Sequence, residues 1–161
     1  MKLIDVLPIY TERLMLKQTS IDDVDLILKM DKQEETQKFL GGIKNKSKEE
    51  RILFLEKKNL NGESLTVFYR NIPIGFIGIK VNDCEVEISY IFDIDYTGRG
   101  FCSEVVQKLI DIIFNKLEIN RIYANCKEEN LASQKVLLNN KFVKKYFKDD
   151  FWCFELLKNE K

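Results

Sequence analysis

A tight loop of Gly98, Arg99 and Gly100 carries the clearest chemical signal in the sequence. It separates a strand-like segment, 85–92, from a helix predicted to begin at about 101–103. The first amide N–H groups of a helix have no partner within it, and the helix dipole adds partial positive charge there. Glycines let the backbone come close to a ligand, and Arg99 supplies a cation. The loop therefore predicts an anion cradle for a phosphate, with an ordinary strand–helix turn as the alternative. Its spacing matches neither of the two common nucleotide-binding glycine motifs.

The sequence contains no histidine, which excludes several kinds of catalytic machinery. Neither a Ser-His-Asp triad nor a Cys-His pair can form. A general base has to be a carboxylate, a water that a carboxylate holds, a tyrosine, a lysine or a thiolate. The four cysteines, Cys84, Cys102, Cys126 and Cys153, form no C-x-x-C pair, so we expect reduced thiols and no zinc site. A helix N-terminus can lower the pKa of a thiol such as Cys102, but a small packing residue is the favoured interpretation.

Length and composition predict one domain spanning residues 1–161. The 26 basic and 26 acidic residues cancel, so bulk charge favours neither nucleic acid nor a membrane surface as a partner. We find neither a signal-peptide pattern at the N-terminus nor an apolar run long enough to span a bilayer. The expectation from these features is a cytoplasmic protein.

Hydrophobic periodicity predicts a mixture of strands and helices, an α/β (α+β) fold. We expect strands at 14–19, 64–69, 74–80, 85–92, 121–126, 142–147 and 151–157. We expect helices after Ser20, after the capping box of Ser47 and Glu50, over 103–117, and after Asn130. Strand 121–126 should lie parallel to strand 85–92, because a helix makes the crossover between them. Segment 31–45 is expected to be a loop or a short helix.

Residues 95–104, DYTGRGFCSE, resemble motif A of the GCN5-related N-acetyltransferases, the GNAT family. The family pattern is Q/R-x-x-G-x-G/A. It aligns Thr97 with the Q/R position, Gly100 with the central glycine and Cys102 with the last position. Gly100 matches the pattern, whereas Thr97 and Cys102 depart from it.

Three further segments resemble the same family in the same order along the chain. Residues 130–133, NLAS, followed by Phe142, are similar to motif B, N-x-x-S with a following aromatic residue. Residues 11–14, TERL, and residues 87–90, EISY, are similar to segments of the RimJ/RimL-like branch. The resemblance covers about residues 11–157.

The resemblance implies the GNAT fold and acetyl-CoA as co-substrate. That fold has a mixed, mostly antiparallel sheet of six to seven strands, splayed in the middle and flanked by about four helices. The pantetheine arm would lie along the backbone where two strands part, and the pyrophosphate would face the glycine loop. Asn130 would lie near the thioester, and it is also predicted to cap a helix. The implied cofactor-binding residues are Tyr90, Ile91, Phe92, Thr97, Gly98, Arg99, Gly100, Phe101, Cys102, Ser103 and Asn130.

The implied reaction is direct attack of a primary amine on acetyl-CoA in a ternary complex. Glu87 is the best candidate for the base, acting through a water because the unperturbed pKa of a carboxylate is far below that of an amine. Glu85 is the reserve candidate, and for both the alternative is a polar residue on a half-solvated strand face. Ser133 is the best candidate donor to the leaving thiolate, since Leu137 occupies the position where many family members have a tyrosine.

The acceptor stays open between a protein N-terminal α-amine and a small amine such as a polyamine, an amino sugar or an antibiotic. Segment 32–46 corresponds to one wall of the family's acceptor groove, so we expect it to influence acceptor choice. A non-catalytic CoA-binding or interaction module on the same fold is the alternative function. A nucleotide- or phosphate-binding regulator is the least favoured. Phe147, Phe151 and Trp152 could form a homodimer face or close the core.

Overall fold

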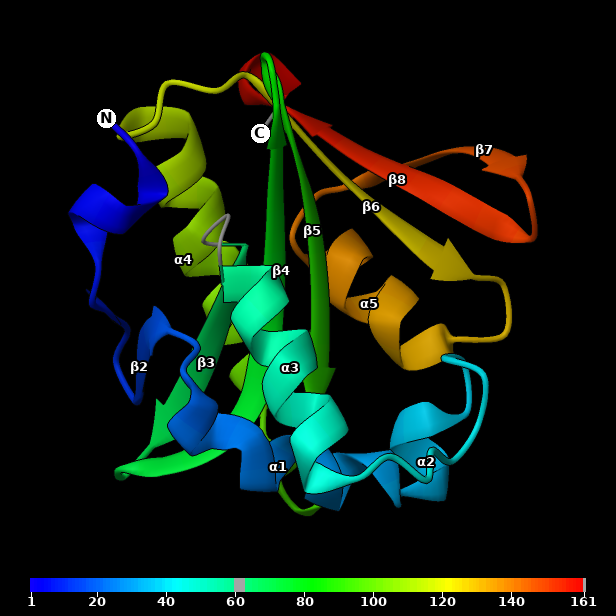
Figure 1. Ribbon diagram of the computed structural model, residues 1–161. Coiled ribbons are helices and arrows are strands. Elements are labelled where there is room, and N and C mark those ends of the chain that lie inside the picture. The colour runs from blue at the N-terminus through cyan, green and yellow to red at the C-terminus, as the bar shows by residue number, and fades with distance from the viewer. Residues whose placement is uncertain (60–62, 161) are drawn as a thin grey trace.

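The computed structural model describes residues 1–59 and 63–160. An eight-stranded sheet runs through these residues in the order β1-β2-β3-β4-β5-β6-β8-β7 (Figure 1). Its strands are β1 (Ile9–Tyr10), β2 (Leu14–Gln18), β3 (Ser64–Tyr69), β4 (Ile72–Asn82), β5 (Glu85–Phe92), β6 (Arg121–Lys127), β7 (Val143–Lys148) and β8 (Phe151–Leu157).

The predicted, mostly antiparallel sheet is confirmed. β5 and β6 are parallel, and every other neighbouring pair within the described residues is antiparallel. The seven strands expected from the sequence correspond to β2–β8, and the eighth, β1, was not among them. Two residues are too short for alternation to reveal a strand, and only the pairing of β1 with β2 defines it.

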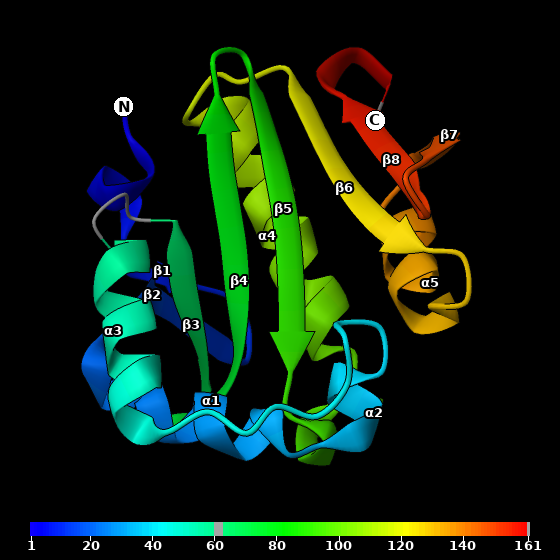
Figure 2. The same ribbon diagram turned by 45° about the vertical axis from the view of Figure 1, so that its right-hand side comes forward.

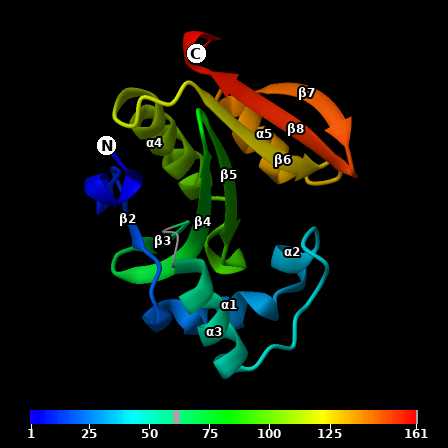
Figure 3. The same cartoon turned by 45° about the horizontal axis from the view of Figure 1, so that its top comes forward.

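Helices cover both faces of the central strands (Figure 3). They are α1 (Val24–Asp31), α2 (Glu34–Gln37), α3 (Lys48–Asn59), α4 (Phe101–Asn115) and α5 (Leu131–Asn139). The three N-terminal helices lie on one side of the sheet, and α4 and α5 lie on the other. The predicted capping box before α3 is confirmed, since Ser47 and Glu50 exchange two hydrogen bonds. No helix in residues 1–59 and 63–160 is long and apolar enough to cross a membrane.

Two apolar cores result from this arrangement. The apolar stripe of α4 packs on one face of the sheet, where Val105 and Leu109 share a buried cluster with Val86 and Ile88 of β5. On the other face, α1 and α3 enclose a smaller cluster that includes Phe76 of β4. β5 is therefore covered on both faces, which fixes its position next to the loop that follows it.

The parallel strands β5 and β6 part after a short contact. They pair only over Glu85–Glu87 and Arg121–Tyr123, whereas β4 pairs with β5 along its whole length, Glu85–Phe92. Figure 2 shows the two strands close together at one end and separated at the other, where α2 lies near the opening. The splayed sheet that the resemblance implied is thus present.

Candidate active site

The glycine loop adopts the conformation that an anion cradle requires. Gly98 and Gly100 have φ angles of +78° and +79°, in the left-handed region that side chains other than glycine rarely adopt. A Cβ placed on Gly98 would meet no atom within 4 Å, so the space beside the loop is open. Among the described residues, none accepts a hydrogen bond from the amide N–H groups of 98–103. Open space beside unpaired amides at a helix N-terminus fits a bound diphosphate.

Arg13 clamps this loop to the helix that follows. Its Nη2 donates to the carbonyl oxygen of Arg99 at 3.0 Å, and its Nε donates to Glu104 at 2.8 Å. Its guanidinium carbon lies 4.4 Å from the centre of the Phe101 ring. Burial raises the pKa of Glu104, but hydrogen bonds from Thr11 and Arg13 outweigh it and hold the pKa below its ordinary value. The carboxylate therefore stays charged and the clamp stays intact at neutral pH.

Several side chains of the predicted cofactor-binding segment are buried or form hydrogen bonds with other residues of the protein. The Thr97 hydroxyl donates to a carbonyl of the preceding turn at 2.9 Å. Phe101 is buried in the core and the partly buried Cys102 packs against it, as the packing interpretation predicts. Burial raises the pKa of the Cys102 thiol to about 12. The Ser103 hydroxyl accepts a hydrogen bond from Asn140 at 3.1 Å. Phe101 and Cys102 can therefore offer a ligand only their main-chain N–H groups.

The gap between the strands brings a tyrosine and a serine together. Tyr90, Ile91 and Phe92 lie on the part of β5 that has lost its pairing with β6. The Tyr90 hydroxyl lies 2.9 Å from the Ser133 Oγ and 3.2 Å from the Ser133 carbonyl oxygen. Burial raises the pKa of Tyr90 well above its ordinary value, so its hydroxyl is protonated at neutral pH.

The start of α5 completes this part of the gap. The Asn130 side chain accepts a hydrogen bond from the Ser133 N–H at 3.2 Å, which confirms Asn130 as the helix cap. Leu137 is fully buried, so the position of the usual tyrosine belongs to the core. The hydroxyl groups near the gap come instead from Tyr90 and Ser133.

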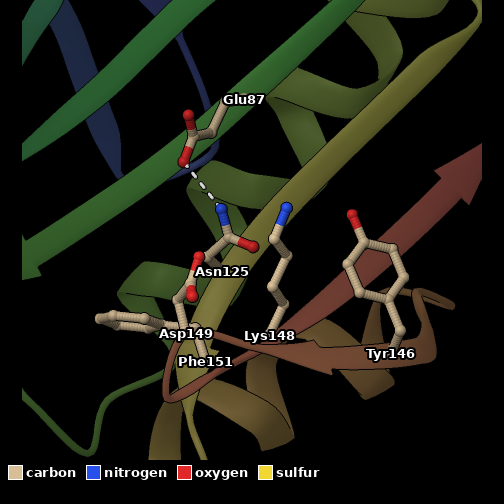
Figure 4. A pocket seen from close by; sticks show the side chains of 6 residues that line it. All are labelled: Glu87, Asn125, Tyr146, Lys148, Asp149 and Phe151. Atoms are coloured by element: carbon tan, nitrogen blue, oxygen red, sulfur yellow. Dashed lines mark hydrogen bonds between the residues drawn. The ribbon is translucent and has the colours of Figure 1, made fainter.

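Glu87 lies at the last paired position of β5, where the two strands part. It faces a cavity of about 490 Å³ and accepts a hydrogen bond from Asn125 of β6 at 3.1 Å (Figure 4). The reserve candidate Glu85 is ion-paired to Arg121, which also holds Glu155 at 2.6 Å. Of the two candidates for the base, Glu87 is the one that lines a cavity.

The predicted acceptor wall, segment 32–46, consists of α2 and an ordered stretch after it. Lys44 holds this stretch by donating to the Gln37 side chain at 2.6 Å and to the Leu40 carbonyl at 2.7 Å. Beneath it, the buried carboxylate of Asp31 accepts two hydrogen bonds from Arg51, at 2.6 and 2.7 Å. The wall itself is tied to α1, where the Lys44 N–H donates to the Asp31 carbonyl at 2.9 Å and the Gln37 side chain donates to the Met30 carbonyl at 3.0 Å.

A second set of contacts ties the wall to the cofactor side of the site. Asp93, directly after β5, accepts hydrogen bonds from Lys29 at 2.6 Å and from Gln33 at 2.8 Å. Burial raises the pKa of Asp93, but these two partners outweigh it and keep the pKa below its ordinary value. The junction of α1 and α2 is therefore anchored where β5 leads into the glycine loop.

The comparison with known families agrees with this geometry. Residues 13–143 match the model of the acetyltransferase (GNAT) domain. The chain belongs to the GNAT acetyltransferase family. Among relatives of this family, an uncharacterized N-acetyltransferase, p20, from Bacillus licheniformis is 31% identical over 172 residues, which cover 94% of this chain and 97% of p20. The chain is thus an acetyltransferase by family membership.

Solved GNAT structures have the same fold. The ribosomal L7/L12 alpha-N-protein acetyltransferase RimL, in complex with coenzyme A, superposes with a TM-score of 0.73 at 17% identity, covering 94% of this chain and 97% of RimL. The spermidine N-acetyltransferase from Vibrio cholerae, in complex with CoA and spermine, gives 0.77 at 17% identity, covering 92% and 97%. At this identity the likeness establishes the fold alone.

Sequence reasoning missed the residues that hold the site in shape. In the sequence Arg13 stands out only as part of the TERL segment, and its partner Glu104 is 91 positions away. The pair of Lys29 and Asp93 is 64 positions apart. Neither pairing has a local signal, because each depends on how the sheet brings distant segments together.

Proposed function

We propose that the chain transfers an acetyl group from acetyl-CoA to a primary amine, by direct attack in a ternary complex. The observation that carries this proposal is the parting of β5 and β6 directly after Glu87. Glu87 therefore lies where the gap between β5 and β6 begins. The gap widens toward the end of β5, which leads into the loop with the unpaired amides of 98–103. Acetyl-CoA fits this arrangement, with its phosphates at the amides of 98–103 and its thioester near Glu87.

The cradle and the gap bind and orient the co-substrate. In this proposal the N–H groups of 98–103 hold the pyrophosphate, and the free edge of β5 at Tyr90, Ile91 and Phe92 pairs with the amides of the pantetheine arm. When bound, acetyl-CoA supplies the activated acetyl group. Arg13 keeps the cradle in shape through its bond to the Arg99 carbonyl.

Glu87 removes the proton that makes the amine unreactive. An ammonium group has no lone pair for attack, so it has to lose a proton before the C–N bond forms. The Glu87 carboxylate accepts this proton through a water, and Asn125 orients the carboxylate from the neighbouring strand.

Tyr90 and Ser133 stabilise the departing thiolate. Both hydroxyls lie near the gap and share one hydrogen bond, so one of them is free to donate to a ligand. The raised pKa of Tyr90 makes it a hydrogen-bond donor rather than a proton source at neutral pH.

The test is a transfer assay with purified protein, acetyl-CoA and a panel of primary amines. The panel holds N-terminal peptides, spermidine and an amino sugar, with thiol release and the mass of the product as readouts. We expect amine-dependent thiol release and an acetylated product for at least one class. Binding of acetyl-CoA without transfer to any amine would contradict the proposal and favour a non-catalytic CoA-binding module.

A further inference from the structure

The cavity in front of Glu87 is lined by charges of both signs. Its walls are formed by Glu87 of β5, Asn125 of β6 and the hairpin of β7 and β8 (Figure 4). The hairpin contributes Tyr146, Lys148, Asp149 and Phe151. Two carboxylates and one ammonium group thus surround the space next to the candidate base.

Lys148 is the one cation among the residues that line this cavity, and its ammonium group has no ion-pair partner among the described residues. None of these residues forms a hydrogen bond with it either. Its neighbours on β7 are engaged elsewhere. Lys145 pairs with Glu155 at 3.6 Å, and the Lys144 ammonium lies 4.2 Å from the centre of the Trp152 ring.

The turn of the hairpin fixes the direction of Lys148. Asp149 and Asp150 have φ angles of +53° and +74°, which is the left-handed pair of a tight two-residue turn. Asp residues tolerate this conformation better than most side chains. Lys148 and Phe151 are therefore held opposite each other at the end of the ladder, in one wall of the cavity.

A molecule that fills this cavity displaces water from both signs of charge. Lys148 and Asp149 are exposed, so attraction or repulsion between these charges and an acceptor is modest, but it still discriminates between acceptors of different charge. An acceptor with only amines satisfies Glu87 and Asp149 but puts a like charge against Lys148. An acceptor with several negative charges, such as a phosphate ester, would be repelled by the two carboxylates.

We infer that the acceptor is a primary amine that also carries a carboxylate. The amine lies at Glu87 and the carboxylate binds Lys148. This inference rests on the proposed function and narrows its acceptor class. A free amino acid and a peptide with an acidic residue near its N-terminus share this chemistry.

The experiment compares acceptors that differ only in charge. Peptides with glutamate, glutamine or lysine in the second position, free glutamate and spermidine are assayed with wild-type protein and acetyl-CoA. We expect the highest kcat/KM for an acceptor with a carboxylate. The relative rates of free glutamate and of the glutamate peptide distinguish an amino acid from a polypeptide as the source of that chemistry.

Charge reversal at Lys148 tests directly whether this residue selects the acceptor. Lys148→Glu should lower the ratio of kcat/KM for the glutamate peptide over the lysine peptide by about tenfold, since an attraction at an exposed site becomes a repulsion. Asp149→Asn, which suits the left-handed turn, should raise the same ratio. The matched control is Lys144→Glu, an equal charge change on the same strand outside the cavity, and it should leave the ratio unchanged.

Two failures are distinguishable. The inference would be overturned, and the proposed function kept, by either of two results. In the first, Lys148→Glu and Lys144→Glu have the same ratio of kcat/KM for the glutamate peptide over the lysine peptide. In the second, the wild-type protein acetylates spermidine in preference to the peptides. Absence of transfer to every acceptor would overturn both.

Discussion

The hydroxyl oxygen of Tyr90 lies 2.9 Å from the Ser133 Oγ, so β5 and α5 are joined by a side-chain hydrogen bond across the gap in the sheet. The residue one helical turn after Ser133, Leu137, is fully buried and apolar. In this chain the hydroxyl groups that face the gap therefore come from a strand and from the first turn of the helix. This relationship gives the first prediction.

Removal of either hydroxyl should slow turnover. Tyr90→Phe and Ser133→Ala are each expected to lower kcat by about tenfold to a hundredfold, because one variant removes the hydroxyl that donates to the developing thiolate and the other removes the hydroxyl that orients it. The KM for acetyl-CoA should change much less, since the cradle at 98–103 is untouched. Steady-state kinetics measure both constants. Tyr123→Phe is the control, a tyrosine of the adjacent strand β6, and an equal loss of kcat in this variant would contradict the assignment.

Glu87→Gln should separate chemistry from binding. The amide keeps the size of the side chain and can still accept from Asn125, but it takes up no proton. We expect kcat at neutral pH to fall by about a hundredfold while acetyl-CoA affinity stays the same. At higher pH a larger fraction of the amine is neutral by itself, so the deficit should shrink.

The control for Glu87 is Glu85→Gln, which breaks an ion pair with Arg121 outside the cavity. It should affect stability more than rate. An unchanged kcat in Glu87→Gln would remove Glu87 from the mechanism.

A buried ion pair joins α1 to α3 beside the acceptor wall. Asp31 is 3% exposed and its only ion-pair partner in the described residues is Arg51, at 2.6 Å. Arg51→Met leaves that carboxylate buried and unpaired, so the free energy of unfolding should fall by about 3 kcal/mol. Urea unfolding measures the change.

The matched control for this prediction is Lys48→Met on the same helix. Lys48 pairs with Asp25 at 3.4 Å, and both side chains are exposed. The loss there should stay below about 1 kcal/mol. Equal losses in the two variants would show that burial of Asp31 does not make its ion pair stronger than an exposed one.

Much of the fold could be predicted because its signals are local. Alternation located β5, helical spacing located α4, and the cap residues Ser47 and Asn130 marked two helix starts within a residue or two. Residues 87 and 90 of a strand point to opposite faces, and in the structure Glu87 lines the cavity whereas Tyr90 contacts Ser133 of α5. The positive φ angles of Gly98 and Gly100 agree with the role assigned to glycine there.

The rest depends on contacts between distant segments. Arg13 and Glu104 meet because the segment before β2 lies against the first turn of α4, and Lys148 shares a cavity with Glu87 although β6 and β8 stand between their strands in the sheet. No spacing rule relates such residues. A cytoplasmic location, a homodimer and the roles of Glu87 and Ser133 stay predictions.

The central claim is that the loop at 98–103 binds the pyrophosphate of acetyl-CoA, and calorimetric titration tests it most directly. Wild-type protein should bind acetyl-CoA and not ATP. Gly100→Val should abolish binding, because a β-branched residue is strained at φ +79° and its side chain would stand beside the amides that face the pyrophosphate. Gly42→Val, at φ +85° in the acceptor wall, carries the same backbone strain away from the loop and should bind normally. Undiminished binding by Gly100→Val, or no binding by the wild type, would contradict the account.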